Sequence, residues 1–132
     1  MRSAWRTAWQ RHLQGLPLEP LQAQLADVIA LHPEYHALLA ESDAIAAEGA
    51  QANDPRADAY LHLSLHLALR EQLATDRPRG IAQIHSQLSA AARETHAAEH
   101  RMIEVLARTL WEAQRAARMP DEQQYLEALR RL

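Results

Sequence analysis

From Arg56 to Ala74 the sequence reads RADAYLHLSLHLALREQLA, a stretch without glycine, proline or any β-branched residue. Leucine, alanine, arginine, glutamate and glutamine favour helices, whereas strands favour the β-branched residues that this stretch lacks. The same bias extends over the whole chain, whose 132 residues include no phenylalanine and only three glycines. We therefore expect an all-α fold.

Glycines and prolines divide the chain into the helices that we expect. The second helix begins near Pro20 and should kink or restart at Pro33, because proline removes an N–H group and clashes with the preceding turn. The periodic pattern fades over residues 41–58, which indicates a long connection. The other helices are expected over residues 3–14, 56–74, 81–88, 92–118 and 121–132. Together they predict a single domain over 1–132, an up-down helical bundle of four core helices with an extra N-terminal helix and a short C-terminal helix.

Apolar stripes at helical spacing identify the expected core. The stripe of the first helix contains Trp5, Trp9, Leu13 and Leu16, and that of the second contains Leu21, Leu25, Val28, Ile29 and His32. We interpret the two tryptophans as packing residues, with a homodimer through the Trp5/Trp9 helix as the alternative. The arginines near the C-terminus are interpreted as a solvated face: Arg108, Arg115, Arg118, Arg130 and Arg131.

Charge and composition exclude several classes of function. The net charge is −3, lysine is absent and the arginines form no clustered stripe, so no nucleic-acid surface is expected. The chain has no cysteine, which leaves histidines and carboxylates as the only metal ligands. Residues 1–6 lack the apolar core of a signal peptide, and no apolar run approaches a membrane span of about 20 residues. We expect a cytoplasmic protein, and the richness in alanine, arginine and leucine is typical of a GC-rich bacterial genome.

Three pairs of histidines recur at a spacing of four residues: His32 and His36, His62 and His66, and His96 and His100. This spacing places both rings of a pair on one helix face, one turn apart. Random placement of eight histidines would give roughly half of one such pair by simple counting. The number of pairs is therefore more than composition explains.

The pairs lie on the stripes that we expect to face the core. A buried imidazole needs partners for its ring nitrogens, because an unsatisfied buried polar group costs a few kcal/mol. A metal ion satisfies one nitrogen, and a carbonyl or carboxylate satisfies the other. Glu104 follows His100 by four residues and is the best placed carboxylate. The first expected ligands are His62, His66, His100 and Glu104, followed by His36, His96 and His32.

The three pairs can meet at one level of an alternating bundle only if the chain breaks near Ser89. A continuous helix there would move His96 and His100 out of register by roughly 10 Å, at 1.5 Å per residue. Two known metal-binding signatures are absent from the sequence. The chain has no His-Glu-x-x-His motif, and Arg93 and Ala97 stand where a Glu-x-x-His motif would need glutamates.

Four phrases of the sequence, taken in order, resemble a bacterial family known as domain of unknown function 1841. They are His32-Pro33-Glu34-Tyr35-His36, Leu61 to Gln72, Asp76-Arg77-Pro78-Arg79-Gly80-Ile81, and Ala98 to Arg115. The chain departs from the family between Asn53 and Tyr60, where we expect an insertion. The resemblance implies a small bacterial protein and brings no assigned activity.

The leading hypothesis is a metal-binding helical bundle that holds iron, zinc or manganese through paired histidines and a carboxylate. If it is an enzyme, metal-activated water or oxygen chemistry is the expected class. The alternative is a metal-free protein-interaction or dimerisation module, in which the histidines form a buried polar network or a pH sensor.

Overall fold

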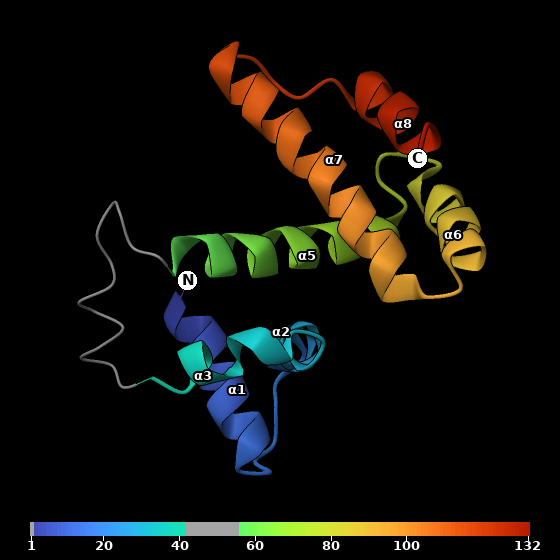
Figure 1. Cartoon of the computed structure of the whole chain (residues 1–132). Coiled ribbons are helices and arrows are strands. Elements are labelled where there is room, and N and C mark those ends of the chain that lie inside the picture. Colours follow the sequence, from blue (N-terminus) through green and yellow to red (C-terminus); the bar gives the residue numbers. More distant parts are fainter. Residues whose placement is uncertain (1, 42–55) are drawn as a thin grey trace. The chain divides into compact units, whose positions relative to one another are not determined.

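The computed structural model describes residues 2–41 and 56–132, and all the regular structure among them is helical. The chain divides into two compact units, Met1–Leu67 and Ala68–Leu132 (Figure 1). The helix α5 (Ala57–Thr75) contributes residues to both units. The predicted all-α fold is confirmed, while the prediction of a single domain stays a prediction.

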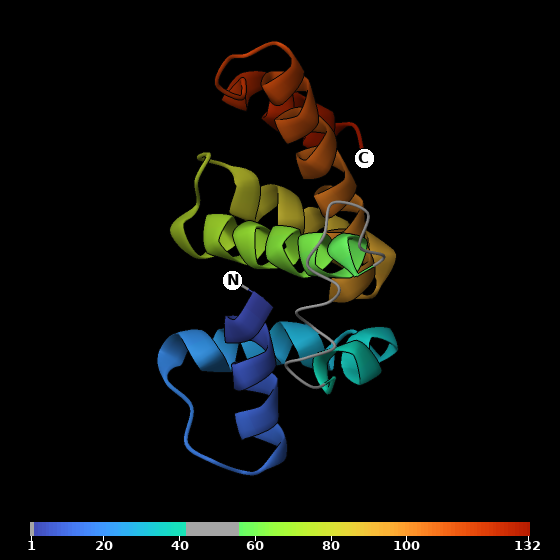
Figure 2. The ribbon, with the colours of Figure 1, turned by 90° about the vertical axis from the view of Figure 1, so that its left-hand side faces the viewer.

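The first unit contains α1 (Arg2–Leu13), α2 (Pro20–Ala30), the short 3-10 helix η1 (Pro33–Tyr35), α3 (His36–Leu39) and the first part of α5. Helix α1 crosses α2 (Figure 2), and α3 also packs against α1. One apolar core joins these elements: Trp5, Ala8, Trp9, Leu25, Ala26, Val28, Ile29, Leu39, Tyr60, Leu63 and Leu67. The interpretation of the two tryptophans as packing residues is therefore confirmed.

Three leucines that were expected in this core are exposed: Leu13, Leu16 and Leu21. Leu13 is the last residue of α1, and Leu21 belongs to the first turn of α2. Leu16 lies in the connection between the two helices, just after Gly15, which turns the chain with a φ of +69°. Helical spacing placed these three leucines on the core-facing stripes, but they lie at helix ends and in the connection, where the side chains are exposed.

The predicted interruption at Pro33 is confirmed. Helix α2 ends at Ala30, Pro33 is the first residue of η1, and α3 restarts the helix at His36. The predicted long connection over 41–58, including the expected insertion, lies mostly outside the described residues. The following helix was expected over 56–74 and is observed as Ala57–Thr75.

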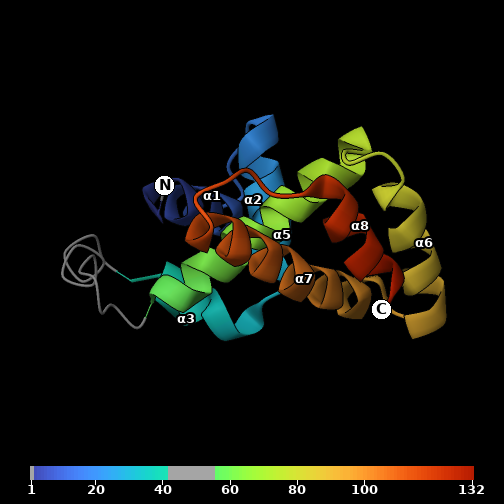
Figure 3. The same ribbon diagram turned by 90° about the horizontal axis from the view of Figure 1, so that it is seen from above.

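The second unit contains the end of α5, α6 (Ile81–Ala92), α7 (Thr95–Arg115) and α8 (Glu122–Arg130). Helix α6 packs against α7, and α8 contacts both of them (Figure 3). Asp121 caps α8, since its side chain accepts a hydrogen bond from the backbone N–H of Gln124 at 3.1 Å.

The chain does break between α6 and α7, but four residues later than expected. The break falls at Arg93, whose φ of +59° is in the left-handed region, and not at Ser89. No glycine or proline marks this position in the sequence. Among the described residues, no helix has both the length and the apolar character that crossing a membrane would require.

Candidate metal centre

The end of α2 determines how His32 is held. Pro33 has no N–H and stops the helix, and the last carbonyls of α2 accept bonds from only three residues on: Val28 from Leu31 at 3.2 Å and Ile29 from His32 at 2.9 Å. Each keeps a lone pair for a side-chain donor. The Nδ1 atom of His32 lies 2.7 Å from the carbonyl oxygen of Val28. A carbonyl oxygen can only accept, so Nδ1 of His32 carries the proton and donates it. In the neutral ring, the Nε2 atom of His32 therefore keeps a free lone pair.

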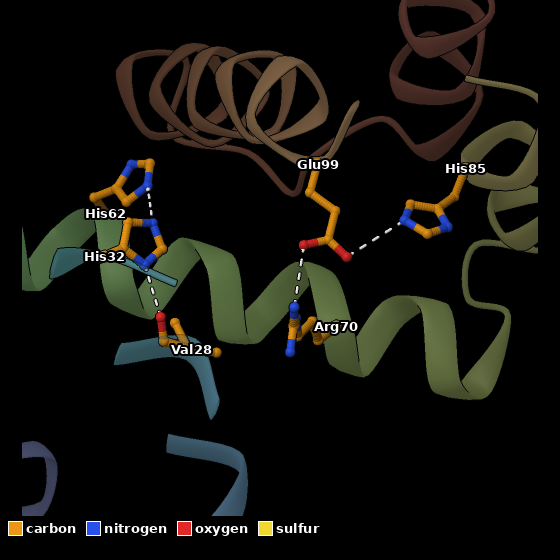
Figure 4. A network of polar contacts seen from close by, with 6 residues as sticks. All are labelled: Val28, His32, His62, Arg70, His85 and Glu99. Carbon is orange, nitrogen blue, oxygen red and sulfur yellow. Dashed lines mark hydrogen bonds and ion pairs between the residues drawn. The ribbon is translucent and has the colours of Figure 1, made fainter. Parts of the chain in front are cut away.

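His62 uses that lone pair. Its Nε2 atom lies 3.0 Å from Nε2 of His32, and Figure 4 shows the two rings joined in this way beside the Val28 carbonyl. With both rings neutral, His62 donates from Nε2 and His32 accepts. The result is a directed chain of hydrogen bonds from His62 through His32 to the backbone.

His66 completes a group of three imidazoles, which we call the histidine trio: His32, His62 and His66. One ring nitrogen of each residue lies within 4.8 Å of one ring nitrogen of both others. The His66 ring stands edge-on to the His32 ring, with centroids 5.1 Å apart. His32 and His66 are fully buried, and His62 is half-buried. All three belong to the first unit.

Tyr35 covers one side of the trio. Its ring is stacked on His32 at 5.6 Å between centroids and lies 6.2 Å from the ring of His62. Burial raises the pKa of Tyr35 above its usual value, and the nearby carboxylates of Glu34 and Asp58 act in the same direction. A neutral phenol ring therefore lies against the trio. Sequence reasoning did not single out Tyr35, although it stands inside the His32–His36 phrase.

His36 was expected among the ligands, but the structure gives it a different set of contacts. Its Nε2 atom donates to the carbonyl oxygen of Ile29 at 2.9 Å, and its ring packs on Trp9 at 4.5 Å between centroids. His36 thus adds a side-chain hydrogen bond to a carbonyl at the end of α2, one that also accepts the backbone N–H of His32 at 2.9 Å. The four-residue spacing from His32 to His36 reflects two histidines that cap one helix end, and His36 lies outside the trio.

The third pair lies on α7 in the second unit. The rings of His96 and His100 are in contact, with centroids 4.1 Å apart, and both are half-buried. Glu104, the carboxylate expected to accompany them, has an exposed side chain. The contact between the two rings agrees with their spacing of one helical turn.

The buried carboxylate of α7 is Glu99 and not Glu104, the carboxylate that the sequence indicated as best placed. Only 4% of Glu99 is exposed. Arg70 donates to one carboxylate oxygen at 3.4 Å, and Nε2 of His85 lies 3.4 Å from the other (Figure 4). Glu99 shares a helical stripe with Met102, Ile103 and Leu106, all buried, and this was the signal in the sequence that could have identified it.

A family model described as Domain of unknown function (DUF1841) matches residues 1–131. The chain belongs to this family. The resemblance seen in the four sequence phrases is therefore confirmed. No curated protein and no solved structure matches the chain.

Two of the DUF1841 phrases supply the histidine trio and its surroundings. The phrase from His32 to His36 contributes His32, Tyr35 and the helix-capping His36, and the phrase from Leu61 to Gln72 contributes His62 and His66. Neutral imidazole nitrogens are good ligands for zinc, copper, iron and nickel. In this DUF1841 chain, the arrangement can therefore act either as a set of nitrogen ligands or as a hydrogen-bonded polar cluster.

Proposed function

We propose that this DUF1841 chain binds a divalent transition metal through His32, His62 and His66. The observation that carries the proposal is the closeness of three ring nitrogens, all within 4.8 Å of one another, inside a buried part of the first unit. A metal-binding histidine usually donates its other ring N–H to a carbonyl or carboxylate. His32 already does so, toward the carbonyl oxygen of Val28.

The metal would take the place of the hydrogen bond between His62 and His32. His62 donates to His32 across 3.0 Å, and a metal bound to both Nε2 atoms would occupy that place. His62 must then carry its single ring proton on Nδ1 instead of Nε2. His32 needs no such change, since the Val28 carbonyl already holds its proton on Nδ1.

A fourth ligand is proposed on sequence grounds alone. His100 is the first candidate because it stands four residues from both His96 and Glu104. Glu104 and His96 remain further candidates, each to be tested by substitution, whereas His36 already donates to the Ile29 carbonyl. Three imidazoles favour zinc or iron, and an additional carboxylate would improve the site for manganese. The proposed setting is the cytoplasm of a bacterium.

The test is elemental analysis of protein purified without a histidine tag, together with thermal unfolding in the presence of added zinc, iron(II) or manganese. We expect about one metal ion per chain, and a stabilisation of about 2.7 kcal/mol when the free metal concentration is a hundred times its dissociation constant. His62→Ala and His66→Ala should abolish both effects. His12→Ala is the matched control, because His12 is exposed and lies outside the trio.

A metal content far below one per chain, with no thermal stabilisation by any of the three metals, would overturn the proposal. The result would then favour the metal-free alternative, which one observation supports: the hydrogen bonds of His32 are complete without a metal. In that case the trio is a buried polar network, and its role is tested by the oligomeric state in solution. A stability that does not change between pH 5 and 7 would further exclude a pH sensor.

A further inference from the structure

A cavity of about 380 Å³ lies in the second unit, between α7, the connection after it, and α8. Its apolar lining is made of small side chains: Val105 and Ala113 are buried, and Ala128 is half-buried. Small residues on two facing helices leave a space that larger ones would fill. This volume is within the range of sites that hold small molecules.

Charged side chains surround this apolar lining. Arg108, Arg118 and Arg131 bring three guanidinium groups, and Glu112 and Glu127 bring two carboxylates. None of these five side chains forms an ion pair with another of the described residues. Both signs of charge are therefore available around the cavity for a bound molecule.

The backbone after α7 is strained at the point that brings Arg118 to the cavity. Ala117 has a φ of +52°, a left-handed conformation that is unfavourable for alanine. The turn is closed by two backbone hydrogen bonds, from Ala117 to Gln114 at 3.2 Å and from Arg118 to Ala113 at 3.0 Å. These two bonds are the Schellman pattern that ends many α-helices, and they fix the place of Arg118 beside the cavity.

We propose that this cavity binds an amino-acid-sized zwitterion. Guanidinium groups bind a carboxylate through two parallel hydrogen bonds, and a glutamate carboxylate binds an ammonium group. Asp121 also lines the cavity, but its side chain caps α8. With it, three arginines face three acidic residues, so neither a plain anion nor a plain cation is favoured. The apolar lining accommodates a short aliphatic side chain.

The experiment is a titration of the full chain followed by NMR, with three probes that share one aliphatic chain. L-norvaline carries both charges, pentanoate keeps only the carboxylate, and butylamine keeps only the ammonium group. We expect norvaline to shift the resonances of residues 105–131 and to saturate. Pentanoate and butylamine should bind at least about tenfold more weakly than norvaline, since each lacks one charged hydrogen-bonding group.

Two variants locate the site. Arg118→Gln removes a guanidinium from the cavity and should weaken norvaline binding about tenfold. Arg79→Gln is the control, since Arg79 is an exposed arginine before α6 that does not line the cavity. The proposal is overturned if norvaline does not saturate, if pentanoate binds as tightly as norvaline, or if Arg79→Gln weakens binding as much as Arg118→Gln. In those cases the three arginines, which are exposed, act only as the solvated face that the sequence indicated.

Discussion

Replacing His32 by alanine removes a ring that is fully buried and that makes two hydrogen bonds, to the Val28 carbonyl and to His62. Each hydrogen bond contributes about 1 kcal/mol. Truncating a buried side chain of this size costs about 2 kcal/mol more in lost contacts and cavity formation. The Val28 carbonyl retains a bond from the backbone N–H of Leu31 at 3.2 Å, so no further penalty is added. The expected loss is about 4 kcal/mol.

Urea unfolding of the metal-free protein, in the presence of a chelator, measures this loss. Two other variants give the scale. His36→Ala removes a half-buried ring with one hydrogen bond to a carbonyl and should cost about 1–2 kcal/mol. His12→Ala removes an exposed ring and should stay within about 0.5 kcal/mol of the wild type. If His32→Ala costs no more than His12→Ala, the burial and hydrogen bonding that hold the trio in place are refuted.

Two further substitutions test the second unit. Tyr125→Phe removes a hydrogen bond of 2.8 Å to Gln72 and should cost about 1 kcal/mol at neutral pH. Burial raises the pKa of Tyr125 above its usual 10.0, so the unfolded chain loses this proton first and stability falls as the pH rises beyond about 10. The loss of stability between pH 8 and pH 11, measured by urea unfolding, should be smaller in Tyr125→Phe than in the wild type. Equal losses in the two proteins would contradict this. Ala117→Gly relieves the left-handed strain and should raise stability by about 0.5–1 kcal/mol in thermal unfolding, whereas a decrease would show that the turn is not strained.

The fold class could be predicted from composition, because helix-forming residues dominate and strand-forming residues are scarce. The interruption at Pro33 could be predicted as well, since proline acts through its own covalent structure. The break at Arg93 could not be predicted from the sequence. An arginine in a left-handed conformation is imposed by the packing of α6 against α7, and the local sequence carries no sign of it.

The leucines of α5 show a second limit of prediction from the sequence. Leu61, Leu63, Leu65, Leu67 and Leu69 occupy every second position, so a helix distributes them around its circumference. Leu63 and Leu69 are fully buried, whereas Leu61 is 57% exposed. Helical spacing alone cannot say which of them faces the core, because that choice depends on the elements that pack against α5.

The candidate site could be predicted in part. Spacing identified His62 and His66 as neighbours on one helix face, and burial supports their choice. Spacing also paired His32 with His36, but it could not show that both histidines donate to backbone carbonyls. Glu99 and Glu104 differ by five positions on one helix, and only the surrounding packing distinguishes the buried carboxylate from the exposed one.

The backbone acceptor of His32 has a consequence for how such a site is recognised in other proteins. Because Val28 contributes a carbonyl oxygen, any apolar residue at that position would leave the same ring nitrogen of His32, Nδ1, as the donor. What matters is where the helix stops, and that is set by Pro33. Related centres should therefore be sought by a pattern of position: an apolar helix, a histidine, a proline directly after it, and a second histidine three residues beyond the proline. Searches for preserved side chains around the histidine would overlook them.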